Sequence, residues 1–132
     1  LKLTTTKAEI LKSLLEGISM EMKMNLHLMT SSGMEIDTFI ATGGGARNDK
    51  WSQLKADILN RKVIVRNIKE AGCFGVSLLA RQAETGEKPE SLEFSNSDAD
   101  KVFFPDEKKA AVYEEKFLSY TNLYPALKQF WQ

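Results

Sequence analysis

Three consecutive glycines, Gly43 to Gly45, constrain this sequence more than any other feature. They follow Ile36–Thr42, an apolar segment rich in β-branched residues that predicts a strand, and they precede a helical pattern. Without side chains, they leave the free amide groups and the positive dipole end of that helix open to a phosphate or a flat base. The spacing matches neither a dinucleotide fingerprint nor a phosphate-binding loop with a Lys-Ser/Thr pair. On the glycines alone, a flexible turn is an equal alternative.

A long helix is predicted before the glycines. Thr6 and Glu9 have the spacing of a capping box, and the apolar residues beyond them recur at helical intervals as far as Met29. The helix should run from about Thr6 to about Met29 and end in the breaker Thr30–Gly33.

A shorter helix and a second strand are predicted after the glycines. Asn48 or Asp49 is placed to cap the helix. Its apolar positions are spaced by three and four: Trp51, Leu54 and Ile58. The chain then turns, and Val63–Val65 is apolar throughout, which predicts a buried strand.

The second half of the chain predicts one buried helix, a surface segment and a helical end. Ala71–Ala80 is apolar almost all round, which is typical of a buried helix, and Thr85-Gly86 supplies its stop. The polar residues 87–105 are interpreted as a surface excursion. Helical spacing returns near the end, where Pro125 is expected to open a new turn. Its apolar positions are Val112 or Tyr113, Phe117, Tyr120, Tyr124, Leu127 and Trp131.

This order of elements predicts an α/β fold in one domain that spans residues 1–132. The two strands should be adjacent and parallel, joined by a crossover helix, with Gly43–Gly45 at the carboxyl end of the first strand. Sheets usually have about four to six strands, so partner strands are expected from sequence before Leu1 or from another chain. The first residue is not methionine, which favours a piece of a longer protein.

Composition excludes several classes of partner. The 18 basic and 18 acidic residues cancel, so no overall field attracts nucleic acid or an anionic membrane. No apolar run approaches the ~20 residues of a membrane helix. The single cysteine, Cys73, lies in an apolar stretch, which favours a reducing compartment and hence the cytoplasm. The only histidine, His27, has no ligand cluster around it in the sequence, so neither a metal site nor a nucleophile is predicted.

The stretch from Gly43 to Leu59, GGGARNDKWSQLKADIL, closely resembles the carboxyl-domain signature of the FGGY carbohydrate kinases. That signature is a Gly-Gly-Gly-Ala-Arg run followed by Trp, Gln and Ala-Asp. The pattern from Thr6 to Ile18 is similar to the family's helix before the signature, and Val63–Val65 with Glu70–Gly75 is similar to the strand and glycine-rich helix after it. The resemblance is to xylulokinase-like and fuculokinase-like members.

The resemblance implies an actin-like ATPase domain with a ribonuclease H-like fold. It implies that Gly43, Gly44, Gly45 and Asn48 contact ATP in a cleft between two domains. Mg²⁺ would be bound mainly through the nucleotide and the missing amino-terminal domain, which would also bind the sugar and supply the general base. No catalytic residue is therefore assigned here, and the isolated chain is expected to be inactive. A homodimer stays open.

Several residues also have an ordinary structural interpretation. Asn48 can read an adenine edge or simply cap a helix, and Arg47 can meet a phosphate or stay solvated. Trp51 and Asp57 match the signature, yet both are expected to be structural. Two other functions stay open: a non-catalytic actin-like module that binds nucleotide or acts as a scaffold, and an unrelated α/β interaction domain in which the glycines only make a turn.

Overall fold

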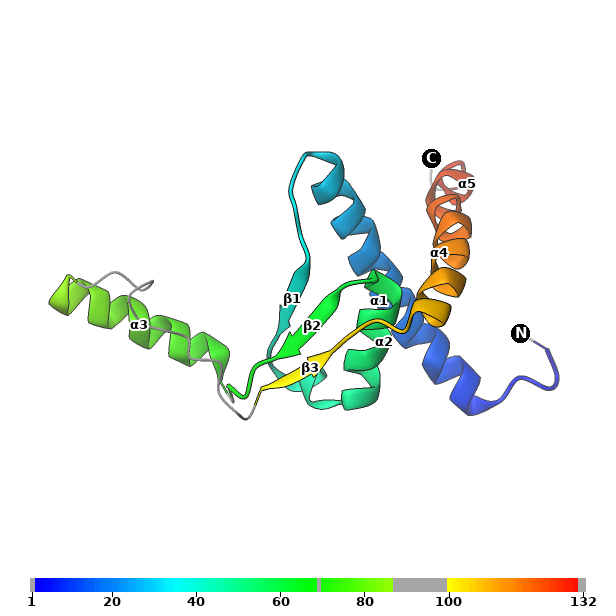
Figure 1. Cartoon of the computed structure of the whole chain (residues 1–132). Helices are drawn as coiled ribbons and strands as arrows, with labels where there is room; N and C mark the ends of the chain where they lie inside the picture. Colours follow the sequence, from blue (N-terminus) through cyan, green and yellow to red (C-terminus); the bar gives the residue numbers. More distant parts are fainter. Residues whose placement is uncertain (1, 69, 87–99, 131–132) are drawn as a thin grey trace.

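A computed structural model describes residues 2–68, 70–86 and 100–130. It is a helix-rich α/β structure with one small sheet (Figure 1). The elements, in chain order, are α1 (Lys7–Ser31), β1 (Thr38–Ala41), the 3₁₀ helix η1 (Gly44–Arg47), α2 (Asp49–Leu59), β2 (Lys62–Val65), α3 (Ala71–Thr85), β3 (Lys101–Phe103), α4 (Glu107–Thr121) and α5 (Leu123–Lys128).

The predicted first helix is confirmed, together with its cap. Thr6 Oγ1 accepts a hydrogen bond from the backbone N–H of Glu9 (3.3 Å), and Glu9 Oε2 accepts one from the N–H of Thr6 (2.7 Å). Both ends of this capping box satisfy amide groups that the first helical turn leaves free. The helix ends at Ser31, just beyond the predicted end.

The predicted strand pair is also confirmed. β1 and β2 are adjacent and parallel, with Thr38 opposite Lys62 and Ala41 opposite Val65, and α2 forms the crossover. The glycines follow the carboxyl end of β1. Parallel neighbours require such a crossover, and α2 is long enough to return the chain to the start of the sheet.

The interpretation of residues 87–105 as a surface excursion is wrong at its end. Lys101–Phe103 forms β3, which pairs antiparallel with β2, so the sheet is mixed and has three strands in the order β1-β2-β3. Arg66 and Asp100 form an ion pair beside it, and Asp100 Oδ1 accepts from the backbone N–H of Asn67 (3.1 Å). Residues 87–99 lie outside the described part. A three-residue strand is too short for an alternating pattern to appear in sequence.

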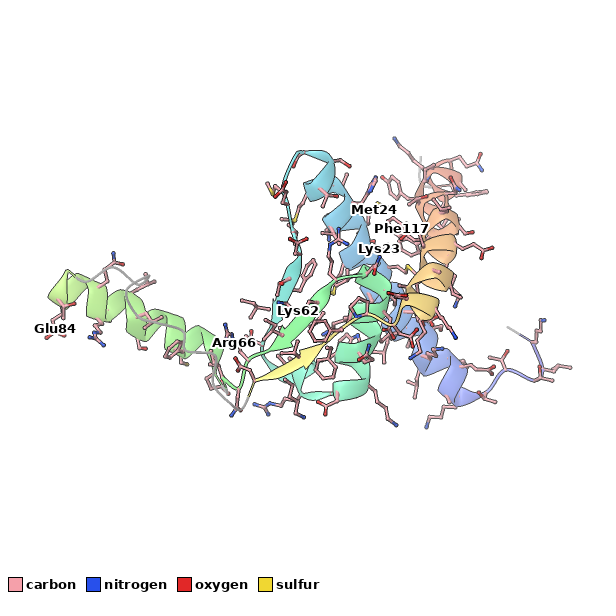
Figure 2. The ribbon with its side chains drawn as sticks, in the orientation of Figure 1. Lys23, Met24, Lys62, Arg66, Glu84 and Phe117 are labelled. Atoms are coloured by element: carbon pink, nitrogen blue, oxygen red, sulfur yellow. The ribbon has the colours of Figure 1, made fainter. Side chains whose placement is uncertain are left out.

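One face of the sheet is covered by helices. Alternation places Phe39, Val63 and Phe103 on the same face, and Val63 is 1% exposed. Over this side, helices α1, α2 and α4 meet in a core of Met20, Ile58, Tyr113 and Phe117. Figure 2 shows Lys23 and Met24 of α1 beside Phe117 of α4. Lys23 is buried, and its charge is paired with Glu114 (2.7 Å).

The predicted burial of the Ala71–Ala80 helix is wrong within this chain. α3 forms, and Gly86 ends it in a left-handed conformation (φ 72°), but none of its residues is buried. It points away from the sheet and the other helices, with Glu84 near its far end (Figures 1 and 2). Val76 is 67% exposed and Leu79 is 62% exposed. The all-round apolar pattern is present, but no described element lies against it to bury it.

The predicted apolar spacing of the carboxyl-terminal part leads to burial in α4 but not in α5, where Tyr124 (63% exposed) and Leu127 (44% exposed) are not buried. Tyr113 and Phe117 of α4 are in the core, and Pro125 lies in the first turn of α5, where a missing amide hydrogen is tolerated. Trp131 lies outside the described residues. None of the helices in the described ranges combines the length and apolar character that crossing a bilayer requires.

Asp57 links α2 to the start of α4. It is 2% exposed, and its Oδ1 accepts from the side-chain amide of Gln53 (2.7 Å) and from the backbone N–H of Asp106 (3.0 Å). Gln53 also donates to the carbonyl oxygen of Phe104 (2.8 Å). Asp57 is therefore a structural residue, as the sequence predicted.

We expect Asp57→Ala to lower the free energy of unfolding by about 1–3 kcal/mol, because two partly buried hydrogen bonds to this buried carboxylate are lost. Urea denaturation followed by circular dichroism measures this. The matched control is Asp49→Ala, which removes an exposed carboxylate 2.7 Å from Lys101 Nζ and should cost about 0–1 kcal/mol. Equal losses in the two variants would contradict the assigned role.

Candidate functional site at the glycine turn

Residues 43–48, which we call the glycine turn, connect the carboxyl end of β1 to α2. Gly43 has φ 79° and ψ −169°, a backbone conformation that L side chains rarely adopt, and its carbonyl oxygen accepts from the N–H of Ala46 (3.2 Å). The first glycine is therefore required by backbone geometry.

The other two glycines are explained differently. A Cβ at Gly45 would lie 2.9 Å from Cζ3 of Trp51, closer than real Cβ contacts, so the indole leaves no room for a side chain there. A Cβ at Gly44 would meet nothing within 4 Å, and Gly44 does not have a positive φ. Neither fold nor backbone requires glycine at position 44. Its α-carbon faces open space.

Asn48 is the N-cap of α2, as predicted. Its Oδ1 accepts from the backbone N–H of Trp51 (3.2 Å), and its carbonyl oxygen accepts from the N–H of Ser52 (2.9 Å). Buried Ser52 donates through Oγ to the carbonyl oxygen of Ala46 (3.3 Å), which fixes the turn against α2. The cap uses only the oxygen of Asn48. Its Nδ2 group donates to none of the residues that the structure describes.

The turn borders two hollows in the surface. An open depression is lined by Gly44, Arg47, Asn48, Asp49 and Lys50. A second hollow, of about 210 Å³, shares Arg47 and Asp49 with it. It is lined by Gly43, Ala46, Arg47, Asn67, Ile68 and Lys101, among others. Exposed Arg47 lines both and has no ion-pair partner among the described residues, so it is available to an anion.

The structure brings the four predicted site residues together: Gly43, Gly44, Gly45 and Asn48. Arg47 lies beside them. Lys101 was not predicted, although it reaches this site from β3 and its Nζ is 2.7 Å from Asp49 Oδ2. A distance of 52 residues separates that pair, and the short strand that carries Lys101 has no sequence signal.

Other reactive residues lie apart from this site. Cys73 is exposed on α3, and His27 packs edge-on against Phe117, with ring centroids 6.3 Å apart. Within the described ranges, no group of three or more His, Cys, Asp or Glu side chains is arranged to hold a metal ion.

Comparison with known proteins identifies the family. The model of the FGGY family of carbohydrate kinases, C-terminal domain, matches residues 1–84. A probable L-xylulose kinase of Haemophilus influenzae is 32% identical over 123 residues, 93% of this chain and 25% of that protein. The xylulose kinase of Bacillus subtilis is 31% identical over 127 residues, 92% of this chain and 25% of that protein. This chain belongs to the FGGY family of carbohydrate kinases, which confirms the resemblance seen in the sequence.

Solved structures agree. A kinase from Brucella ovis superimposes with a TM-score of 0.86 at 28% identity, over 98% of this chain and 27% of that protein. The ligand-bound xylulose kinase of Lactobacillus acidophilus gives a TM-score of 0.81 at 28% identity, over 97% and 26% respectively. The chain thus spans about a quarter of the length of the curated relatives that it matches.

The three glycines should respond differently to alanine. We expect Gly43→Ala to lower stability by about 1–2 kcal/mol because its positive φ becomes strained. Gly45→Ala should also destabilise, through the contact with Trp51. Gly44→Ala should stay within about 0.5 kcal/mol of the wild type. Thermal unfolding of the three variants measures the order, and a large loss at Gly44 would be the contrary result.

Proposed function

We propose that the parent of this chain is an ATP-dependent carbohydrate kinase and that this part binds the nucleotide at the glycine turn. The carrying observation is the open space over Gly44 beside the unused Nδ2 group of Asn48. A flat base can lie against a glycine α-carbon, and an amide N–H₂ can donate to a ring nitrogen of adenine. Gly43, Gly44, Gly45 and Asn48 are the proposed contacts.

The reaction is transfer of the γ-phosphoryl group of ATP to a sugar hydroxyl. Such transfer needs a positioned acceptor, a base near its hydroxyl, Mg²⁺ on the phosphates and donors around the developing charge. From this chain, backbone N–H groups of the turn and the Arg47 guanidinium would supply donors, while the base and the sugar contacts would come from the rest of the parent. Mg²⁺ would be held through the phosphates and that missing part.

The names of two relatives favour one class of sugar. Those of Haemophilus influenzae and Bacillus subtilis are named for L-xylulose and xylulose, which favours a ketopentose. The domain would have the actin-like ATPase fold, and a reducing cytoplasm suits the single exposed thiol of Cys73.

The bare faces of the structure suggest where the rest of the parent lies. Ile40 (61% exposed) and Val102 (47% exposed) share the uncovered face of the sheet, and a groove of about 370 Å³ runs from it to Phe74 and Leu78 of α3. A solved relative keeps this arrangement over 98% of the chain while possessing a further, larger part. We propose that the remaining residues of the parent cover this groove and hold α3 in place.

In the full-length parent, Gly44→Val should weaken ATP binding more than tenfold, about 1.4 kcal/mol, because a branched side chain would occupy the space proposed for the nucleotide. Its fold should be retained, since Gly44 has neither a positive φ nor a close neighbour. Isothermal titration calorimetry measures the affinity, and unchanged binding by the folded variant would refute the proposed site.

A pair of substitutions at Asn48 separates capping from ligand contact. Asn48→Ala loses both, whereas Asn48→Ser keeps a capping oxygen but lacks the amide donor. One lost neutral hydrogen bond contributes about 0.5–1.5 kcal/mol, so both variants should bind ATP a few-fold to roughly tenfold more weakly and discriminate less against GTP. Only Asn48→Ala should melt earlier. If Asn48→Ala loses stability but the ATP-to-GTP preference is unaltered, Asn48 acts only as a helix cap and does not contact the base.

The 132-residue chain alone should show no sugar-dependent ATP hydrolysis or sugar phosphorylation, because it lacks the proposed base and sugar pocket. A coupled ADP-release assay with a panel of ketoses measures this, with the full-length parent as the positive control. Turnover above background by the chain would contradict the assignment of the base and sugar pocket to the rest of the parent. ATP binding without sugar-dependent turnover in the parent would instead favour a non-catalytic nucleotide-binding module.

A further inference from the structure

The indole of Trp51 lies against the back of the glycine turn. Three adjacent atoms of its six-membered ring, Cζ3, Cη2 and Cε3, lie 2.9, 3.4 and 3.5 Å from where a Cβ of Gly45 would be. Trp51 is also the residue whose backbone N–H is capped by Asn48. One residue of α2 therefore touches the turn through its ring and through its backbone. A displacement of the ring must displace the turn or open a gap beneath it.

Lys55 holds the ring from the next turn of α2. Its Nζ lies 4.2 Å from the centre of a ring of Trp51, and its side chain is largely buried (9% exposed). Desolvation lowers the pKa of Lys55. None of the ion pairs formed by the described residues includes it. The face of an aromatic ring attracts a cation, and this attraction is strongest where water is excluded. The indole is therefore the one group in the described structure that compensates this ammonium.

The indole N–H of Trp51 does not hold the side chain in place. Nε1 of Trp51 is buried and donates to no acceptor in the described residues. A buried tryptophan usually finds a partner for this group. Packing, including the contacts with Gly45 and Lys55, therefore positions this side chain, and replacement by phenylalanine removes ring volume without breaking a side-chain hydrogen bond.

We propose that Trp51 is a positioning residue for nucleotide binding. Its indole, held in place by Lys55, fixes the position of the glycine turn without touching the ligand. The proposal rests on the nucleotide site proposed above. Gly44 and Asn48 offer their groups to the nucleotide from a turn whose back is a single aromatic ring. The affinity for ATP then depends on the packing of the Trp51 indole against the glycine turn.

The test is a double-mutant cycle in the full-length parent. Gly45→Ala should raise the KM for ATP about tenfold, or about 1.4 kcal/mol, because the new methyl group pushes the turn off the indole. Trp51→Phe should raise it similarly, because the support is removed. In the double variant the methyl group fills the vacated space, so the KM for ATP should return to within about threefold of wild type. For Trp51→Phe, whose side chain does not touch the ligand, the KM for sugar and kcat at saturating ATP should stay within about twofold.

Losses that simply multiply, or a parallel rise in both KM values, would overturn the proposal and leave Trp51 as an ordinary packing residue. A variant that unfolds does not end the test, because Lys55→Met keeps the buried stem and removes only the charge. It should raise the KM for ATP a few-fold, whereas Lys55→Arg should not. The control is Lys116→Met on α4, far along the chain from the turn, which removes an ammonium 5.1 Å from the ring centre of Tyr113. Unlike Lys55, Lys116 is half-exposed and lies 3.8 Å from a carboxylate oxygen of Glu16. An equal effect of the two methionine substitutions would also overturn it.

Failure of this proposal is distinguishable from failure of the nucleotide site itself. If Gly44→Val leaves ATP affinity unchanged, the site is wrong. If Gly44→Val abolishes binding while the effects of Gly45→Ala and Trp51→Phe are independent, the site stands and the positioning role of Trp51 is wrong.

Discussion

Burial of most of α2 is the constraint on which the rest of the structure depends. Ile58 and Ser52 are fully buried, and the helix packs between the sheet and the pair α1 and α4. Its amino end carries the cap of the glycine turn, and Asp57 near its carboxyl end anchors the entry to α4. Because one rigid helix makes all these contacts, the turn has a fixed position relative to the core. A ligand that binds there does not have to order it, and such preorganisation favours affinity.

The features that were correctly predicted from the sequence depend on residues close to one another in the chain. The capping box of α1, the strand before the glycines and the cap at Asn48 each depend on residues within a few positions of one another, and each is present. The grouping of the four site residues follows from the same locality, because they lie in one six-residue turn. The structural role of Asp57 was also accessible, since an acidic residue at a buried helical position needs donors nearby.

What the sequence could not predict depends on distant partners. β3 forms because β2 has a free edge and because Arg66 can pair with Asp100, not because Lys101–Phe103 has a strand pattern of its own. The apolar character of α3 was read correctly, yet burial is a property of two surfaces, and the second is not among the described residues. Lys55 was missed for a related reason. A lysine on a helix is ordinarily solvated, and only the fold shows that an indole replaces water around this one.

The position of the proposed site explains why this part of the protein should need the rest. Ligands of α/β sheets bind beyond the carboxyl ends of the strands, which is where the glycine turn lies. Here that edge is open, with exposed Arg47, Asn48 and Lys50 around a shallow depression. Phosphoryl transfer in such a place would compete with water, because electrostatic stabilisation is weak where solvent enters and because an activated phosphate can be hydrolysed.

The same structure that carries this open edge also has two uncovered apolar surfaces, the free face of the sheet and α3 (Figure 1). A second part that packs on those apolar faces would be fixed beside the turn, so that a modest hinge motion could close the site and exclude water. Apolar burial would then provide the attachment, and the polar turn would stay free for the nucleotide.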